Sequence, residues 1–167
     1  MVNTKLFIVW LGLLLLFGLS ACSMEQTALS KGKPPPAFQL QSLSGSERKF
    51  PEDFTGKVVV IRFWADWCPF CENEMQAIEP IYRKYQDDGL VVLALNVRQD
   101  RETAADFIGK LNISYEALLD QEGETARAYG VIGLPTTFII DREGRLYTRI
   151  VGESTAKLFE QIVVELM

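Results

Sequence analysis

The most specific pattern in this chain is Trp64-Ala65-Asp66-Trp67-Cys68-Pro69-Phe70-Cys71. It places two cysteines directly after an apolar run that has the pattern of a buried β-strand. Cysteines in such a position can lie at the N-terminal end of a helix, where backbone N–H groups and the helix dipole stabilise a thiolate. Because the thiolate is the form of sulfur that attacks disulfides, the stretch predicts a redox site.

Cys68 and Cys71 fit a metal site or a structural role less well than a redox role. A zinc site needs four ligands, and the chain has neither a second cysteine pair nor any histidine. A structural disulfide between them would close almost no loop and so would add little stability. Two buried cysteines without a chemical role remain an alternative, because free cysteine is often a small apolar residue. Thiol–disulfide chemistry is the favoured interpretation.

The residues between the cysteines predict a role for each sulfur. Proline is favoured at the first position of a helix, where its missing N–H would have no partner, so Pro69 is expected to begin a helix. Cys68 then lies just before the helix, near free amides, and is expected to be the attacking thiol. Cys71 lies one turn into the helix and is expected to be more buried, placed to resolve a mixed disulfide.

The N-terminus carries a separate signal. Lys5 precedes an apolar run of about 14 residues, Leu6–Leu19, which suits a signal peptide better than a membrane span; an uncleaved anchor is the alternative. The following Leu19-Ser20-Ala21-Cys22 resembles a bacterial lipobox, which implies cleavage before Cys22 and attachment of lipid to it. We therefore predict a signal peptide over residues 1–21, a lipid-anchored tether over residues 22–36 and a folded domain over residues 37–167.

Composition narrows the classes of function. The 167 residues and 48% hydrophobic content suit one packed domain with an appendage. A formal net charge of −5, with no basic run, gives nucleic-acid binding no electrostatic support. The lack of histidine removes imidazole as a general base, a metal ligand and a haem ligand.

Hydrophobic periodicity predicts an α/β fold. A hairpin over residues 38–50 should precede a central strand at 57–64 and a helix from the cysteines to Gly89, in which Pro80 predicts a kink or short break. Further strands are expected at 90–97, 114–119, 138–140 and 146–151, and further helices at 104–111, 124–129 and 158–166. Helices between the early strands imply parallel pairing, and the tight turn at 141–144 implies an antiparallel pair. The order predicts a mixed central sheet flanked by helices.

The stretch 63–71, together with Gly133-Leu134-Pro135-Thr136-Thr137-Phe138, resembles the thioredoxin fold. The closer resemblance is to the membrane-anchored TlpA/ResA/CcmG-like thiol–disulfide oxidoreductases. It runs from about Pro36 to the C-terminus and includes the N-terminal hairpin and a helix–strand insertion near 101–119. The resemblance implies that Leu134–Pro135 is a cis peptide facing the cysteines. It also implies a substrate groove, to which we assign Trp67, Pro69, Phe70, Leu134 and Pro135, although packing in the domain is the simpler explanation of Trp67.

Two charged residues are expected to control protons at the dithiol. Glu74 comes three positions after Cys71, about one helical turn further on. In the resembling proteins a glutamate at this position lies near the thiols, which implies that Glu74 carries the proton of the resolving step; a solvated helix charge is the alternative. Arg62 departs from the aspartate or asparagine of the relatives. We hypothesise that it pairs with Glu74 or another acid and lowers the thiol pKa, the alternative being a side chain that extends to the sheet edge.

The sequence as a whole predicts an extracytoplasmic, lipid-anchored thiol–disulfide oxidoreductase. Its redox couple is Cys68–Cys71, and no metal or other cofactor is expected. The expected partners are a disulfide-containing protein, a membrane thiol donor such as a DsbD/CcdA-like protein, and the membrane itself through Cys22. The resemblance points to cytochrome c maturation. A Cu(I) metallochaperone using the same thiolates is the rival from another class, and a thiol peroxidase is the third candidate.

Overall fold

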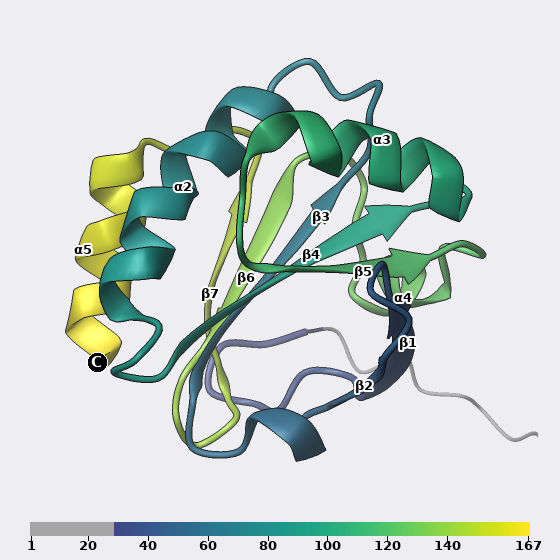
Figure 1. Cartoon of the computed structure of the whole chain (residues 1–167). Coiled ribbons are helices and arrows are strands. Elements are labelled where there is room, and N and C mark those ends of the chain that lie inside the picture. Colours follow the sequence, from purple (N-terminus) through teal and green to yellow (C-terminus); the bar gives the residue numbers. More distant parts are fainter. Residues whose placement is uncertain (1–28) are drawn as a thin grey trace, which may run out of the picture.

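The structure is a computed structural model that describes residues 29–167 (Figure 1). The predicted signal peptide and Cys22 lie outside the described residues. Within them, no helix is both long enough and apolar enough to cross a membrane.

One mixed sheet of seven strands, flanked by helices, makes up the described part of the chain, which confirms the predicted fold class (Figure 1). The strands are β1 (Phe38–Ser42), β2 (Glu47–Phe50), β3 (Val58–Trp64), β4 (Leu90–Val97), β5 (Glu116–Asp120), β6 (Thr136–Ile140) and β7 (Leu146–Val151). The helices are α2 (Cys71–Tyr85), α3 (Arg101–Leu111), α4 (Glu124–Ala128) and α5 (Ala156–Leu166), with a short 3-10 helix η1 (Glu52–Phe54).

The sheet places β3 between a parallel and an antiparallel neighbour. The strand order is β2-β1-β5-β4-β3-β6-β7, in which β3, β4 and β5 are parallel while β6, β7 and the hairpin add antiparallel pairs. Because β6 runs against β3, the residues that precede β6 lie at the same end of the sheet as the residues that follow β3. The register Phe63↔Thr136 thus brings the cysteine stretch and the Pro135 stretch to the same end of the sheet.

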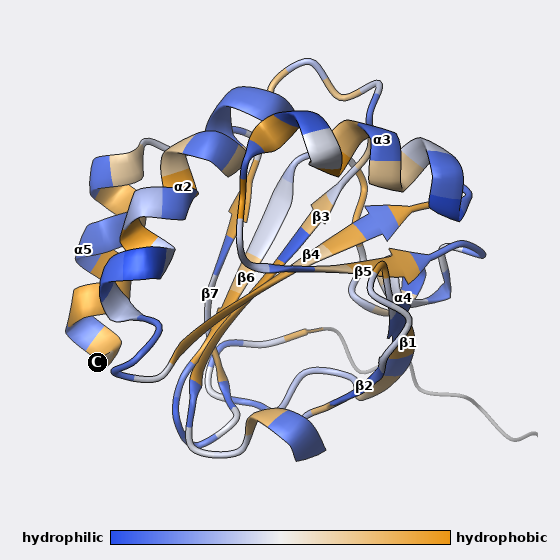
Figure 2. Ribbon diagram, viewed as in Figure 1, coloured by the Kyte–Doolittle hydropathy of each residue, from blue (hydrophilic) through white to orange (hydrophobic). Residues whose placement is uncertain are grey.

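Every residue of β3 is buried, as its apolar pattern predicts, so the strand contributes to both cores of the domain. Figure 2 shows that hydrophobic residues line the central strands of the sheet. Its even-numbered apolar residues, such as Val60 and Trp64, pack under α2, α3 and α5. Its odd-numbered residues, such as Ile61 and Phe63, pack on the other face with the hairpin and α4. Alternation of side chains along a strand sends Arg62 to the same face as Val60 and Trp64, and therefore beneath α2.

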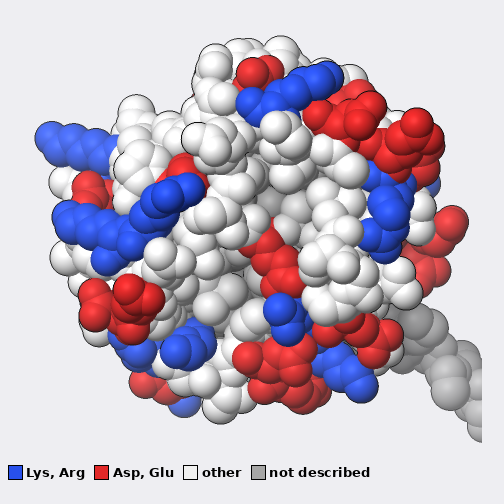
Figure 3. All heavy atoms as spheres, in the orientation of Figure 1, with Lys and Arg blue, Asp and Glu red and all other residues white. Residues whose placement is uncertain are grey.

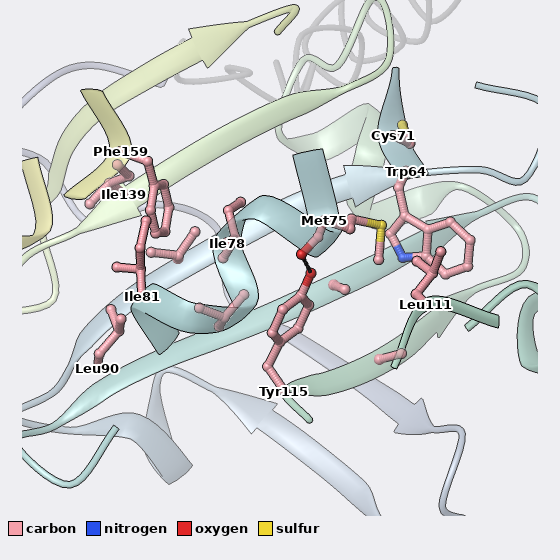
Figure 4. Packing of buried hydrophobic residues seen from close by; sticks show 14 of the residues in the cluster. Trp64, Cys71, Met75, Ile78, Ile81, Leu90, Leu111, Tyr115, Ile139 and Phe159 are labelled. Atoms are coloured by element: carbon pink, nitrogen blue, oxygen red, sulfur yellow. Dashed lines mark hydrogen bonds between the residues drawn. The ribbon is translucent and has the colours of Figure 1, made fainter. Parts of the chain in front are cut away.

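Helix α2 packs on the sheet through an apolar stripe, beside which Tyr115 makes a buried hydrogen bond to the helix (Figure 4). Met75, Ile78 and Ile81 lie on its inner face among residues of the sheet and α5. The Tyr115 hydroxyl donates to the backbone oxygen of Met75 at 2.7 Å. These contacts fix the helix that carries both catalytic candidates, Cys71 and Glu74.

Two predicted boundaries around α2 differ from the structure. The helix begins at Cys71 and not at Pro69, because the residues from Ala65 to Cys71 form two successive turns, closed by Cys68 N–H to Ala65 O and Cys71 N–H to Cys68 O at 3.2 Å each. Of the kink or short break predicted at Pro80, the break is absent, since α2 continues through this residue.

The last residues of the predicted tether already lie against the domain. The Gly32 N–H donates to Leu146 O and the Leu146 N–H to Lys33 O, so this segment pairs with the start of β7. The Tyr129 hydroxyl donates to Pro36 O at 2.7 Å. Residues 32–36 are therefore packed on the domain that was predicted to begin at residue 37.

Candidate active site

The cysteine pair lies where β3 ends and α2 begins. A disulfide joins Cys68 and Cys71, whose Cα atoms are 5.5 Å apart, so the structure shows the oxidised form. Cys68 is 3% exposed and Cys71 is fully buried, the order of burial that the sequence predicts. The positive end of the α2 dipole lies at Cys71, next to both sulfurs, and favours negative charge there after reduction.

Exposed apolar side chains surround the less buried cysteine. Trp67 is 68% exposed and Phe70 is 49% exposed. The simpler explanation of Trp67 as a packing residue is therefore wrong; Trp64, which stacks on Phe107 and is fully buried, is the packing residue of this stretch. Trp67 and Phe70 are open to a second molecule that approaches Cys68.

The Leu134–Pro135 peptide is cis, as the resemblance implies. The pairing of Phe63 with Thr136 places it beside the end of β3 that leads to the cysteines. Its neighbours anchor it on both sides, because the Gly152 N–H donates to Pro135 O and the Thr136 hydroxyl donates to Gly133 O. Leu134 is half-buried and packs against the core that contains both cysteines.

A buried ion pair lies one turn below the cysteines. Arg62 of β3 is fully buried, and its Nη2 donates to Glu74 Oε2 at 2.6 Å, which confirms the predicted pairing with Glu74. Its Nη1 donates to the hydroxyl of Thr137 on β6 at 3.1 Å. The alternative of a side chain extended to the sheet edge is wrong. Arg62 Nε has no hydrogen-bond partner among residues 29–167.

The Glu74 carboxylate is hydrogen-bonded at both oxygens. Its Oε1 accepts from the backbone N–H of Ser154 at 3.0 Å and from the Ser154 hydroxyl at 2.6 Å. Burial alone raises the pKa of this carboxyl, but the hydrogen bond and charge of Arg62 and the two hydrogen bonds from Ser154 outweigh burial. The pKa of Glu74 is therefore lowered, and the solvated-charge alternative is wrong, since Glu74 is only 6% exposed.

Comparison with known proteins assigns the fold and the chemistry. Residues 31–149 match the AhpC/TSA family. The chain belongs to this family. Thiol-disulfide oxidoreductase ResA of Bacillus cereus is 34% identical to it over 155 residues, which cover 89% of each chain. Thioredoxin-like protein YneN of Bacillus subtilis is 34% identical over 143 residues, which cover 83% of this chain and 82% of that protein.

A solved structure agrees with these relatives. The crystal structure of a candidate thiol:disulfide interchange protein DsbE from Chlorobium tepidum matches with a TM-score of 0.76 at 34% identity, covering 83% of this chain and 99% of the other. This member of the AhpC/TSA family is thus a thiol–disulfide oxidoreductase of the ResA/DsbE type with a thioredoxin-like fold.

Three residues that the sequence pattern does not single out support the site of this oxidoreductase. Gln99 ties the cysteine loop to β4: its Oε1 accepts from the Asp66 N–H and from Asn96 Nδ2, and its amide group donates to the Asp66 carboxylate. Thr137 and Ser154 hold Arg62 and Glu74. All three bond partners at long sequence separations, and the hydroxyl that caps α5 is that of Thr155, not that of Ser154.

Proposed function

We propose that this oxidoreductase is a lipid-anchored reductant outside the cytoplasm that reduces a disulfide in a protein partner through Cys68 and Cys71. The observation that carries the proposal is the position of the pair, at the N-terminus of α2 and beside exposed Trp67 and Phe70. A partner's disulfide can reach Cys68 along this apolar surface, whereas Cys71 is fully covered.

The exchange proceeds in two attacks. In the reduced enzyme the Cys68 thiolate attacks one sulfur of the partner's disulfide; that S–S bond breaks, a mixed disulfide forms, and the partner's other sulfur leaves with an electron pair and takes up a proton. Cys71 then loses its proton and attacks the sulfur of Cys68. The Cys68–Cys71 disulfide forms as the bond between Cys68 and the partner breaks, and the partner's sulfur leaves with the electron pair and takes up a proton, so two electrons have passed to the partner. A dithiol donor at the membrane, such as a DsbD/CcdA-like protein, returns the enzyme to its reduced form.

The groove residues position the partner. Trp67, Pro69 and Phe70 flank Cys68, and the Leu134 backbone before cis-Pro135 offers hydrogen-bonding groups to an extended segment. The pKa of Glu74 is lowered and its carboxylate accepts three hydrogen bonds, both of which favour the charged form. We therefore do not assign Glu74 the predicted role of proton carrier. Arg62 provides a buried positive charge on β3. Its side chain lies on the same face of the strand as that of Trp64, which directly precedes the cysteine loop.

The resemblance to ResA/CcmG-like proteins supports cytochrome c maturation, or another protein-folding process outside the cytoplasm, as the setting. The lipobox-like Leu19-Ser20-Ala21-Cys22 supports attachment to the membrane. In cells expressing the full chain and supplied with a labelled fatty acid, the wild type should incorporate the label and Cys22→Ser should not. A wild-type protein that incorporates no label contradicts the lipid anchor.

Trapping of the mixed disulfide tests the roles of the two sulfurs. Reduced Cys71→Ser protein should form a stable mixed disulfide with insulin through Cys68, because the second attack is missing. The matched Cys68→Ser variant should form none and should not reduce insulin. Equal trapping by both variants contradicts the assignment of Cys68 as the attacking thiol.

A further inference from the structure

Helix α2 carries two buried carboxylates that are held in the same way. The hydroxyl and the backbone N–H of Ser154 both donate to Glu74, at 2.6 and 3.0 Å. The hydroxyl and the backbone N–H of Ser114 both donate to Glu79, at 2.7 and 2.8 Å. Each carboxylate also pairs with an arginine, Glu74 with Arg62 and Glu79 with Arg83. We refer to these groups as the Ser154 clamp and the Ser114 clamp.

The two clamps differ in their distance from the redox pair. Glu74 follows Cys71 by three residues, about 4.5 Å along the helix, whereas Glu79 follows it by eight, about 12 Å. The arginine of the Ser114 clamp has a side chain that is 59% exposed, while the Arg62 side chain is fully buried. Solvent therefore screens the ion pair of Glu79 with Arg83, whereas the pair of Glu74 with Arg62, nearer the dithiol, is shielded from solvent.

The Ser154 clamp leaves Glu74 little capacity for a proton. A carboxylate offers about four acceptor positions, and three here are taken by Arg62 and Ser154. Two or three such bonds strongly favour the charged form of a carboxyl group. A proton at the remaining position would neutralise the carboxylate, weaken its bond to Arg62 and leave that buried cation without its counter-ion.

The polar and titratable groups around Glu74 come from the sheet, from the loop before α5 and from α2 itself. Arg62 faces it from β3, the uncharged Ser154 bonds it from the loop between β7 and α5, and Cys71 and Glu79 lie on its own helix. Burial raises the pKa of the Tyr115 hydroxyl, just before β5; Arg62 lowers this pKa, and Glu79 and Glu74 raise it. Arg62 is the one cation in this group that contacts Glu74 directly within the described residues.

We propose that Ser154 is a positioning residue, which together with Arg62 keeps Glu74 as a carboxylate in both redox states, so that Glu74 fixes the Arg62 charge under the dithiol and carries no proton in the exchange. The proposal rests on the dithiol function given above. The protons of the two attacks are then exchanged between the sulfurs and solvent.

The proposal is tested by carbon-13 NMR of the glutamate carboxyl groups, recorded as a function of pH for the oxidised protein and for the chemically reduced protein. The Glu74 signal, assigned with Glu74→Gln, should not titrate between pH 5 and pH 9 in either state. In Ser154→Ala its midpoint should rise by about one pH unit, a tenfold gain in proton affinity, and Ser154→Thr should restore the original midpoint.

The Ser114 clamp supplies the matched control. Ser114→Ala should raise the midpoint of Glu79 and leave that of Glu74 unchanged, which separates a local clamp from a general loosening of α2. A Glu74 signal that titrates between pH 5 and pH 9 in the reduced wild-type protein overturns the proposal, and so does an unchanged midpoint in Ser154→Ala. Failure of the wild type to reduce insulin would instead contradict the proposed function and would leave the carboxyl titration as a separate result.

Discussion

At the scale of single residues, the most consequential feature is the buried pair of Arg62 and Glu74. Removing one member leaves an unpaired buried charge, at a cost of about 3–5 kcal/mol. We expect Arg62→Met to lower the free energy of unfolding by this amount in urea titrations. The double variant Arg62→Met/Glu74→Leu should recover most of the loss, because replacing both charges by apolar groups of similar volume is near neutral. A double variant as unstable as the single one would contradict this account of the pair.

The same residues show what sequence can and cannot predict. The pairing of Arg62 with Glu74 was predictable, because a cation in a buried strand needs an anion on the helix that covers it. The contribution of Ser154 was not, since it lies 80 positions from Glu74 and reaches it only through the packing of α5 beside α2. Cys68 and Cys71 were evident from spacing alone.

At the scale of elements, strands were located more accurately than the start of α2. Alternation and continuous apolar runs marked β1, β3 and β4 to within a residue or two. The turns between Ala65 and Cys71 have no hydrophobic period, so the preference of Pro69 for a helix start was misleading there.

Proline inside α2 leads to a prediction for this helix. Pro80 lacks the N–H that would donate to the backbone oxygen of Gln76, yet α2 continues through it. Pro80→Ala should therefore restore this hydrogen bond, while the more flexible unfolded chain of the variant offsets part of the gain. We expect a net rise of about 1 kcal/mol in the free energy of unfolding. Thermal and urea unfolding would measure the change.

Gly109→Ala in α3 is the matched positive control for that measurement. A Cβ at Gly109 meets no atom within 4 Å, so the substitution should add about 0.5–1 kcal/mol. A less stable Pro80→Ala beside a more stable Gly109→Ala would show that the proline is adapted to its site in α2.

At the scale of the whole molecule, exposed apolar side chains gather at the redox end. Trp67 and Phe70 follow β3, Ile132 precedes β6, and Val151 ends β7 opposite Thr136, all at one edge of the sheet. Over the face seen in Figure 3, acidic and basic side chains are interspersed. The place of the hairpin in the strand order was not predictable, because its docking on β5 depends on distant contacts.

The exposed apolar side chains at the redox end should increase the reaction rate with protein substrates but not with small disulfides. Trp67→Ser should lower kcat/KM for insulin about tenfold, since burying an aromatic side chain contributes roughly 1.5–3 kcal/mol. The rate with hydroxyethyl disulfide should stay within about twofold. Val164→Ser, which alters an apolar residue on α5 that is 52% exposed, should leave both rates unchanged. Equal losses with both substrates would contradict a docking role for Trp67.

The reduction potential of the Cys68–Cys71 couple distinguishes a reductant from an oxidant. The protein is equilibrated with reduced and oxidised glutathione, and the reduced fraction is measured after alkylation. A reductant should have a potential near that of thioredoxin, about −270 mV, or lower, so that its disulfide persists at glutathione ratios that reduce strong oxidants. A value near that of DsbA, about −120 mV, would identify an oxidant and contradict the proposed direction of electron flow.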